Sequence, residues 1–321
     1  MFKRADITTV HIEITTRCQA LCPMCPRTDN PNLPSMDWTL DDFKQIFPPK
    51  VLTQLNLIYF CGNYGDPIMN SDLPLMCSYV KETAPHIQID IHTNGGARSK
   101  EWWQDLYNCL PQKHTIVFAL DGLADTHSLY RVNTSFTTVL NNAKTFIDVG
   151  GNAHWVFIRF KHNQHQVNEA RLLAKQNKFS KFVVKDTTRF GLQETTLEPP
   201  TDTPVVFFNE QKFKDVYKTA SIECYALKHN ELYIDATKTV YPCCYLGMGK
   251  FYNSKKTELE NIFTDQTRDI DSLFGDATKG IFNCLQNWNQ FEVYWNDKKL
   301  IQCVRVCGDT PLTKPTTQWK N

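Results

Sequence analysis

The chain has 321 residues, among them twelve cysteines, and a formal net charge of +1. This length allows one large domain or two ordinary ones, and 41% hydrophobic residues are enough to bury substantial cores. The near-zero charge gives no global field for nucleic acid or an anionic membrane, and no apolar run reaches the roughly 18 residues of a membrane span. The first residues show no apolar signal segment, so we expect a cytoplasmic protein whose cysteines are metal ligands or buried apolar groups rather than disulfides.

Short β-rich runs alternate with helical patterns through the first 190 residues. The expected strands are Val10 to Thr15, Leu55 to Phe60, Ile87 to His92, Thr115 to Leu120, Trp155 to Phe160 and Phe182 to Lys185. The expected helices are Leu40 to Phe47, Leu73 to Glu82, Lys100 to Asn108, Phe136 to Asp148 and Val167 to Gln176. Parallel strands need a crossover helix for each return, so this alternation predicts an α/β fold, a partial (β/α)6 TIM-like barrel over residues 1–190. One side of such a barrel is open and suits a bulky substrate.

Three cysteines follow the first expected strand in a CxxxCxxC spacing, at Cys18, Cys22 and Cys25. Three closely spaced thiolates can hold three corners of a four-iron four-sulfur cube, whereas a cluster used only for electron transfer normally takes a fourth cysteine. The fourth iron is then open for chemistry. A structural zinc site is the alternative, and it would need a distant fourth ligand such as His11 or His92.

Chemically suggestive residues also follow the later expected strands. The site of a barrel is built from the loops at the carboxyl ends of its strands, and turn residues scattered by chance would decorate both rims. Because the chemically suggestive segments all follow strand ends on one rim, we expect them to line a shared cavity. The segments after the second to sixth strands are residues 62–67, residues 93–96, Asp121 with Gly122, residues 161–163, and Lys185 with Asp186.

The cysteine spacing, together with the following Pro26 and Arg27, resembles the signature of the radical S-adenosylmethionine (SAM) enzymes. In that family the open iron is chelated by the amino acid part of SAM. Gly65-Asp66-Pro67 stands where the family carries a glycine-rich motif ending in glutamate and proline, which binds the SAM amino group. The resemblance extends to the turns after the third and fourth strands and implies SAM contacts from Gly65, Asp66, Thr93, Asn94, Asp121 and Met24.

The pattern changes after about residue 190. Residues 191–215 include Gly191, Pro199, Pro200 and Pro204, which indicates a linker before a small α+β domain at 216–321. In that domain two β-like runs, 231–235 and 239–244, predict a hairpin.

Four cysteines of the second segment can come together, because the hairpin folds its far end back beside its start. Cys224, Cys243, Cys303 and Cys307 would suit a closed iron–sulfur cluster, and the same four sulfurs would also satisfy zinc. The segment resembles the twitch domain, or a reduced SPASM domain, found behind radical SAM barrels, which implies one auxiliary [4Fe-4S] cluster. The notable alternatives are that Cys244 exchanges roles with Cys243, or that Cys284 completes or replaces a ligand.

The resemblance implies an enzyme that reductively cleaves SAM to a 5'-deoxyadenosyl radical, which abstracts hydrogen from a substrate carbon. The cofactor supplies the reactivity and the protein supplies placement, and no catalytic side chain is identified. A fully ligated second cluster favours a net oxidation, and an electron donor such as flavodoxin or ferredoxin is the implied protein partner. The alternative of another class is a non-catalytic iron–sulfur electron carrier or a zinc scaffold, but a carrier has no use for an open iron.

The substrate is indicated less sharply. Few residues precede the first expected strand, which leaves no space for the leader-binding module of many peptide-modifying relatives. A small polar metabolite, sugar or nucleotide derivative is therefore favoured, with a peptide or protein maturase as the alternative. Arg159, Lys161 and Lys185 lie at strand ends that face the expected cavity, and we expect them to meet an anionic group. A solvated helix face accounts for the other cations of that region.

Overall fold

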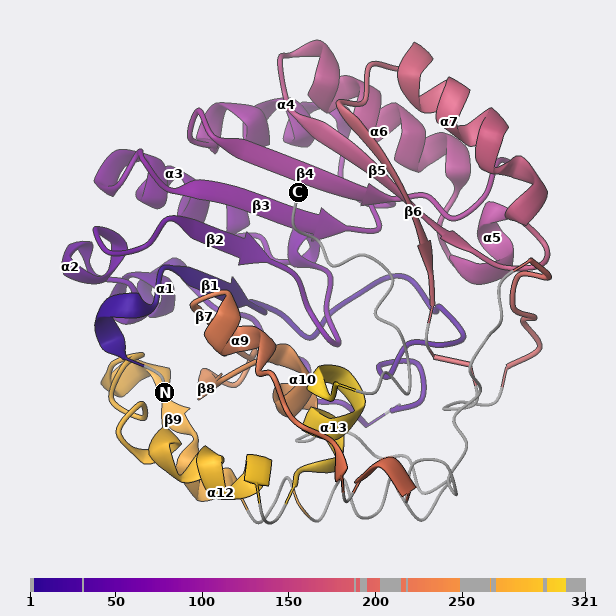
Figure 1. The fold of residues 1–321 in the computed structure, drawn as a ribbon. Coiled ribbons are helices and arrows are strands. Elements are labelled where there is room, and N and C mark those ends of the chain that lie inside the picture. The colour runs from indigo at the N-terminus through magenta and orange to yellow at the C-terminus, as the bar shows by residue number, and fades with distance from the viewer. Residues whose placement is uncertain are drawn as a thin grey trace.

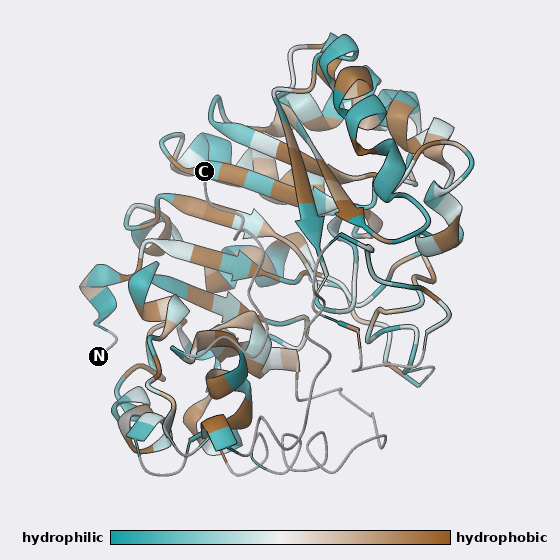
Figure 2. Cartoon of the chain, turned by 45° about the vertical axis from the view of Figure 1, so that its right-hand side comes forward, coloured by the Kyte–Doolittle hydropathy of each residue, from teal (hydrophilic) through white to brown (hydrophobic). Residues whose placement is uncertain are grey.

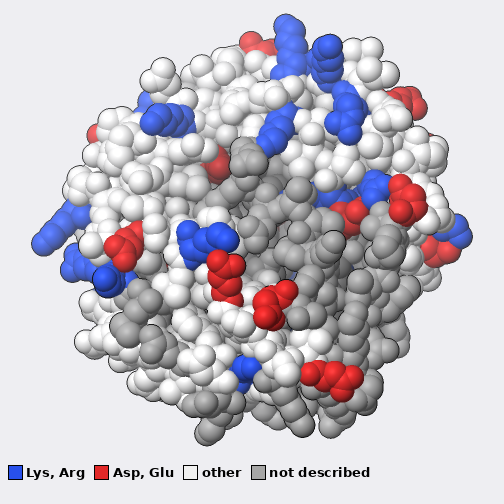
Figure 3. Space-filling view, in the orientation of Figure 1, with Lys and Arg blue, Asp and Glu red and all other residues white. Residues whose placement is uncertain are grey.

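The computed structural model describes residues 3–30, 32–187, 189–190, 195–202, 215–217, 219–248, 266, 270–296 and 299–309. The expected linker at 191–215 lies mostly outside these ranges. Within the described residues, no helix is long and apolar enough to cross a membrane. Basic and acidic side chains both occur on the face seen in Figure 3, as the near-neutral net charge predicts.

One sheet of nine strands runs through the described part of the chain in the order β6-β5-β4-β3-β2-β1-β7-β8-β9 (Figure 1). All neighbours from β6 across to β7 pair in parallel, whereas β8 and β9 are antiparallel. This confirms the predicted α/β class with a partial parallel barrel. The strands are β1 (Thr9–Ile12), β2 (Leu57–Phe60), β3 (Gln88–Thr93), β4 (His114–Ala119), β5 (Ala153–Arg159), β6 (Lys181–Asp186), β7 (Glu231–Ile234), β8 (Thr239–Tyr241) and β9 (Gly275–Asp276).

The crossover helices of the barrel begin and end close to the predicted residues. They cover one face of the parallel strands (Figure 1). The helices of the barrel segment are α1 (Leu40–Ile46), α2 (Pro49–Leu52), α3 (Leu73–Thr83), α4 (Lys100–Cys109), α5 (His127–Tyr130), α6 (Phe136–Asp148) and α7 (Val167–Gln176). Those of the C-terminal segment are α9 (Tyr225–Lys228), α10 (Cys244–Gly247), α12 (Phe291–Asn296) and α13 (Ile301–Cys307). Short 3-10 turns are η1 (Arg4–Asp6), η2 (Pro67–Met69), η3 (Gln164–Gln166), η5 (Asp271–Leu273), η6 (Ala277–Lys279) and η7 (Asn287–Gln290).

Local sequence explains where α1 and α4 begin. Thr39 Oγ1 accepts from Asp42 N over 3.1 Å, and Asp42 Oδ2 accepts from Thr39 N over 3.0 Å, so both halves of a capping box are present. Ser99 Oγ accepts from Trp102 N over 3.3 Å at the start of α4. Each cap satisfies backbone donors that the first turn of a helix leaves without a partner.

Successive side chains of a strand point to opposite faces of the sheet. Figure 2 shows hydrophobic and more polar residues along the central strands. On β1, Val10 and Ile12 are fully buried in the main hydrophobic core. His11 lies between them on the opposite face, where its ring stacks on Tyr59 with centroids 4.1 Å apart and meets the edge of Tyr233 at 4.7 Å. The inner face of the barrel is therefore lined by buried polar rings.

The first strand is shorter than predicted, because its ladder ends at Ile12. The chain beyond it stays buried. Glu13 N still donates to Ile234 O of β7 over 2.9 Å, whereas Ile14 O accepts from Trp38 N over 2.9 Å and Thr15 bridges to Asp37, so the chain then pairs with residues 37–38. An apolar run in the sequence indicates that its residues are buried. It does not show where a strand ends, because a strand also requires a hydrogen-bonded neighbour in register.

The C-terminal hairpin is part of the barrel sheet. Strand β7 pairs in parallel with β1, in register from Thr9 with Glu231 to Ile12 with Ile234. The predicted hairpin is present, with β8 antiparallel to β7. The division of the chain at a linker stays a prediction, but the second segment supplies the strand next to β1 and is thereby joined to the first.

Candidate functional site

The cysteines of the CxxxCxxC motif lie on the loop that leaves β1, and all three are at least partly buried. The backbone turns tightly there, because Cys25 N donates to Cys22 O over 3.0 Å. Burial raises the pKa of the Cys18 thiol to about 12, and the charges of Asp66, Cys25 and Cys22 act in the same direction. The three thiols therefore lie close enough for the charge of one thiolate to raise the pKa of another.

Polar donors face two of these sulfurs. Asn94 Nδ2 lies 3.4 Å from Cys18 Sγ, and Arg131 Nη1 lies 3.8 Å from Cys22 Sγ. Such donors favour the thiolate form and orient the ligands of a metal centre. Arg131 is held in turn by Asp121, whose fully buried carboxylate accepts from Arg131 Nε over 2.6 Å. Asp121 thus reaches the cysteine loop through Arg131.

Asp66 ends the glycine-rich loop after β2 and is 6% exposed. Its Oδ1 accepts from Thr93 Oγ1 over 2.8 Å, and its Oδ2 accepts from Asn94 N over 2.7 Å and from Asn94 Nδ2 over 2.6 Å. Burial raises the pKa of this carboxyl, and the hydrogen bonds from Asn94 and Thr93 oppose the shift. The structure brings three predicted SAM ligands together beside Cys18. Protein donors already meet both oxygens of Asp66, and its contact with SAM stays a prediction.

Gly65 and Gly62 allow the loop after β2 to press against the end of β1. A Cβ at Gly65 would lie 1.8 Å from the carbonyl oxygen of Thr15, and one at Gly62 would lie 2.6 Å from Glu13 Oε1. Neither the backbone of Thr15 nor the carboxylate of Glu13 can move far enough to make room for such a Cβ atom. The predicted cofactor residue Gly65 is therefore required for close approach of two chain segments.

Glu13 is a site residue that the sequence analysis missed. Its Oε1 accepts from Tyr64 N over 2.7 Å and from Gly65 N over 2.8 Å, and its Oε2 accepts from Tyr233 OH over 2.5 Å. Burial raises the pKa of Glu13 to about 7, against the opposing effect of these three hydrogen bonds. A single acid inside the apolar run from Val10 to Ile14 was the signal that could have revealed it.

Met24 is fully buried and packs in a small apolar cluster with Tyr130, Phe160 and Phe190. Its carbonyl oxygen accepts from Arg189 Nη1 over 2.8 Å. Arg189 was also missed. The charges of Tyr130 and Cys25 raise its pKa against the effect of burial. Met24 thus has the apolar surroundings expected beside an adenine ring, and that contact stays a prediction.

The three cations proposed for substrate differ in their surroundings. Arg159 pairs with Asp186 over 2.8 Å and with Asp202 over 2.7 Å. Lys161 pairs with Glu198 over 2.6 Å, and its side chain is half exposed. Both charges are therefore already matched by carboxylates of the chain, and their contact with substrate stays a prediction.

Lys185 lies on β6, in register with Ile158 of β5. Burial lowers the pKa of its ammonium to about 7, while the charges of Cys61 and Asp121 act to raise it. Cys61 follows β2 and Asp121 follows β4, so the side chain of Lys185 lies within electrostatic reach of two other strand ends. Of the three cations, Lys185 is the one whose charge is influenced by residues that follow two other strands, and its contact with substrate stays a prediction.

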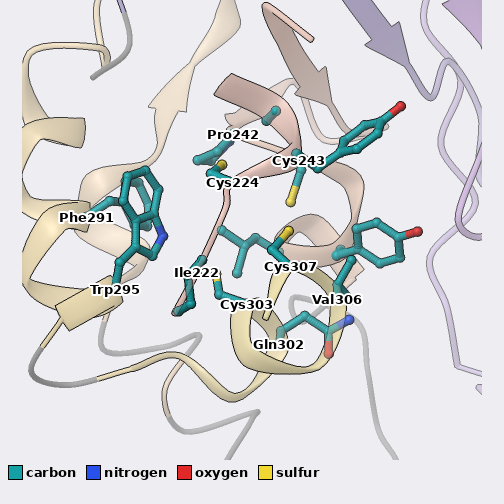
Figure 4. A pocket seen from close by; sticks show the side chains of 14 residues that line it. Ile222, Cys224, Pro242, Cys243, Phe291, Trp295, Gln302, Cys303, Val306 and Cys307 are labelled. Atoms are coloured by element: carbon teal, nitrogen blue, oxygen red, sulfur yellow. The ribbon is translucent and has the colours of Figure 1, made fainter. Parts of the chain in front are cut away.

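Four cysteines from three separate segments line one apolar pocket (Figure 4). Cys224 precedes α9, Cys243 follows β8, and Cys303 and Cys307 lie four residues apart on α13. Burial raises the pKa of the Cys307 thiol to about 11, with the charge of Cys224 in support. The pKa of Cys243 is raised by burial and by the nearby Cys307 and Cys224. The four thiols therefore lie near one another, as the spacing predicts.

The two alternative ligands lie outside this pocket. Cys244 is partly buried. Besides burial, the neighbouring charges of Cys243, Glu231 and Cys61 raise its pKa, and the last two belong to the barrel side. Cys284 is buried against Gly275, where an added Cβ would lie 2.7 Å from the Cys284 Cβ. The geometry favours Cys243 as the residue of this set that faces the pocket.

The chemistry of the donors is what decides whether metal centres fit. Both sites offer sulfur alone, and soft thiolates select iron–sulfur clusters or zinc. Three sulfurs leave one corner of a cube without a protein ligand, and four sulfurs close one. Among the described residues, no group of three or more His, Cys, Asp or Glu side chains is arranged around the position of a single metal ion.

No protein-family model matches this chain, and no curated protein matches it. Solved structures do resemble it. SuiB from Streptococcus suis, with S-adenosylmethionine bound, matches at a TM-score of 0.56 and 15% identity over 94% of this chain and 68% of SuiB. The enzyme anSMEcpe with bound AdoMet matches at 0.60 and 15% identity over 94% of this chain and 81% of its own. Both are radical SAM enzymes, and the likeness shows that this chain has their fold.

Proposed function

We propose that this chain is a radical SAM enzyme that holds a [4Fe-4S] cluster on Cys18, Cys22 and Cys25 and binds SAM beside it. The observation that carries this proposal is the convergence of the three-thiol loop with Asp66 and Asn94 at the carboxyl edge of the sheet. When bound, the cluster and SAM would supply a 5'-deoxyadenosyl radical that removes hydrogen from a substrate carbon. Everything else in the site serves placement.

The placement of SAM falls to three groups of residues. Asp66, with Thr93 and Asn94, offers a buried acceptor to a positively charged amino group. Gly65 lets the backbone of the loop approach closely, because a side chain there would collide with Thr15. Met24 and its apolar neighbours offer a dry surface to an aromatic base. Asp121 acts through Arg131, which it keeps beside Cys22.

We assign the pocket of Cys224, Cys243, Cys303 and Cys307 to one auxiliary [4Fe-4S] cluster. The exclusively sulfur donors and the apolar lining support this assignment. Four protein ligands leave no iron for substrate, which suits a centre that takes up electrons and favours a net oxidation of the substrate. Iron rather than zinc is the expected content, and a metal analysis separates the two.

A small polar metabolite, sugar or nucleotide derivative with an anionic group near Lys185 is the proposed substrate. A peptide is the second candidate. One observation favours it: SuiB has also been solved with its precursor peptide SuiA, and anSMEcpe with a peptide, and both have the fold of this chain. The proposed reductant is a flavodoxin or ferredoxin.

Anaerobic reconstitution tests the proposal. The purified chain should bind about eight irons, two cubes' worth, and should release 5'-deoxyadenosine from SAM when dithionite is added. Zinc in place of iron, or iron without SAM cleavage, would contradict it. To separate the substrate classes, SAM cleavage is compared with and without a metabolite extract and a peptide library, because a true substrate should stimulate turnover.

Once a substrate is known, Lys185→Ala should raise its KM by roughly tenfold, the value of one charge-assisted hydrogen bond. Lys175→Ala is the matched control, because that lysine is exposed on α7, among the cations assigned to a solvated helix face. Equal KM values for wild type and Lys185→Ala would remove this lysine from the site.

A further inference from the structure

The loop of residues 62–66, which we term the bridging loop, is held from the side of the four-cysteine pocket. Asn63 Nδ2 donates to the carbonyl oxygen of Cys244 over 2.9 Å and to Tyr233 OH over 3.2 Å. Cys244 is the neighbour of Cys243 in the chain, and Tyr233 belongs to the β7 strand that leads into the same hairpin. The side chain of Asn63 therefore joins the bridging loop to the turn that carries one of the four thiols.

A second contact fixes the same loop to the C-terminal segment. Tyr64 OH donates to the carbonyl oxygen of Met248 over 2.5 Å, and Tyr64 N donates to Glu13. Glu13 in turn accepts from Tyr233 OH. The middle of the bridging loop is thus held by three residues from β7 onward and by the end of β1, and it has little freedom to move independently of them.

The far end of the bridging loop reaches the first thiol site. Asp66 accepts from both the backbone N and the Nδ2 of Asn94, and the same Nδ2 lies 3.4 Å from Cys18 Sγ. The backbone of residues 63–66 therefore connects two sets of hydrogen bonds, one to the Cys243–Cys244 turn through Asn63 and one to Asn94 and Cys18 through Asp66. Contiguous contacts of this kind are a physical route for energetic coupling between two sites.

We propose that Asn63 is a positioning residue that couples SAM binding at the three-thiol site to the state of the four-cysteine pocket. The inference rests on the proposed function, because it requires both clusters. With Cys243 bound to metal, the adjacent carbonyl of Cys244 would be held in position, and the hydrogen bond from Asn63 would hold the bridging loop with it. Asp66, at the end of the loop, then stands ready for SAM. Loss of the auxiliary cluster should therefore weaken SAM binding without touching any SAM contact.

A double-mutant cycle on the full, anaerobically reconstituted chain tests this coupling. SAM dissociation constants are measured by equilibrium dialysis for wild type, Asn63→Ala, Cys303→Ala/Cys307→Ala and the combined variant. Linkage between two sites commonly amounts to about 5-fold or more in affinity. We expect removal of the auxiliary ligands to weaken SAM binding by roughly fivefold in wild type and by less than about twofold in the Asn63→Ala background. Equal losses in both backgrounds, or no loss in either, would overturn the inference.

Two further variants guard the experiment against simple misfolding. Asn63→Asp keeps the shape of the side chain but cannot donate, so it should behave as Asn63→Ala does. Asn108→Ala removes an exposed asparagine on α4 and should retain the fivefold effect. If Asn63→Asp still showed the full effect, the hydrogen-bond donors of Asn63 would not be the link.

Iron content separates failure of this inference from failure of the proposed function. Wild type with about eight irons and measurable SAM binding, but an additive cycle, contradicts the coupling alone. If the wild type binds no SAM, the proposed function is contradicted and the inference with it. The same holds if the Cys303→Ala/Cys307→Ala variant contains as much iron as the wild type. Coupling is reciprocal, so SAM should also change the electron paramagnetic resonance spectrum of the reduced auxiliary cluster in wild type but not in Asn63→Ala.

Discussion

The two thiol sites of this molecule are built from the same donor atom but in opposite surroundings. The three-thiol loop faces the amide of Asn94 and the guanidinium of Arg131. The four-cysteine pocket is lined mainly by apolar side chains, among them Phe291 and Trp295 (Figure 4). Hydrogen-bond donors and cations stabilise thiolates, whereas an apolar pocket does so only through bound metal.

The contrast indicates different tasks. A site with three sulfurs and polar neighbours can admit a polar ligand at its open position, as SAM binding requires. A site with four sulfurs in an apolar pocket is complete in itself and excludes water, which suits an electron acceptor. The predictions below test this division, beginning with the variant that should change most.

Cys22→Ala should abolish the function of the first site and leave the second intact. Its removal takes away one of only three ligands, so SAM cleavage should fall to background while roughly half of the iron remains. Iron analysis and 5'-deoxyadenosine release measure the two effects. Cys109→Ala, a cysteine outside both motifs, is the control. Full iron content in Cys22→Ala would contradict the assignment of this loop.

Cys303→Ala should have the converse effect. It opens the closed site, so the iron content should again fall by roughly half, while SAM cleavage at saturating SAM should change by less than about threefold. The matched control is Cys284→Ala, which removes a buried cysteine outside the pocket and should keep all iron. Should Cys284→Ala lose iron instead, the ligand set would need revision.

Asp121→Asn should destabilise the first region strongly. The change leaves the guanidinium of Arg131 without its buried counter-charge, which costs about 3–5 kcal/mol of unfolding free energy. Lys228→Ala near the second site breaks an exposed pair with Glu223 and should cost less than about 1 kcal/mol. Denaturant unfolding followed by circular dichroism measures both, and similar values for the two variants would refute the difference in burial.

Glu13, which joins β1 to the hairpin, should make stability depend on pH. Burial raises its pKa from 4.5 to about 7 in the folded chain, so the folded state holds a proton that the unfolded state has lost. The unfolding free energy should therefore fall as pH rises from about 4.5 to about 7, by up to about 3 kcal/mol at 1.36 kcal/mol for each pKa unit. Glu13→Gln has no such proton and should flatten this part of the curve. The same slope in wild type and variant would show that another group is responsible.

Local patterns were sufficient for most elements of the barrel. The expected helices Phe136 to Asp148 and Val167 to Gln176 match α6 and α7, because apolar periodicity and end signals are encoded in neighbouring residues. The first strand was predicted to end three residues too late, because residues 13–15 stay buried beyond the last residue of β1. Burial is visible in a sequence, but the partner that accepts the hydrogen bonds is not.

The same distinction applies to the candidate site. Spacing alone indicated the three-thiol loop and the Cys303–Cys307 pair, since ligands on a short loop or one helix face are close whatever the rest of the chain does. Cys224 and Cys243 joined that pair only through the expected hairpin and the resemblance to the twitch domain. Glu13 and Arg189 were not found, and Asn63 was named only within residues 62–67, because each acts on a residue far away in the sequence. The ion pairs of Arg159 were hidden for the same reason.

The sequence by itself determined the alternation of strands and helices, the rim on which the polar loops gather, and the sulfur chemistry of the two sites. Only the tertiary structure decided that β7 lies in parallel beside β1, and therefore that the bridging loop touches both sites. The physical reason is separation along the chain. Residues 9–12 and 231–234 have no local signal in common, and their pairing follows from which sheet edge is left for the returning chain to cover.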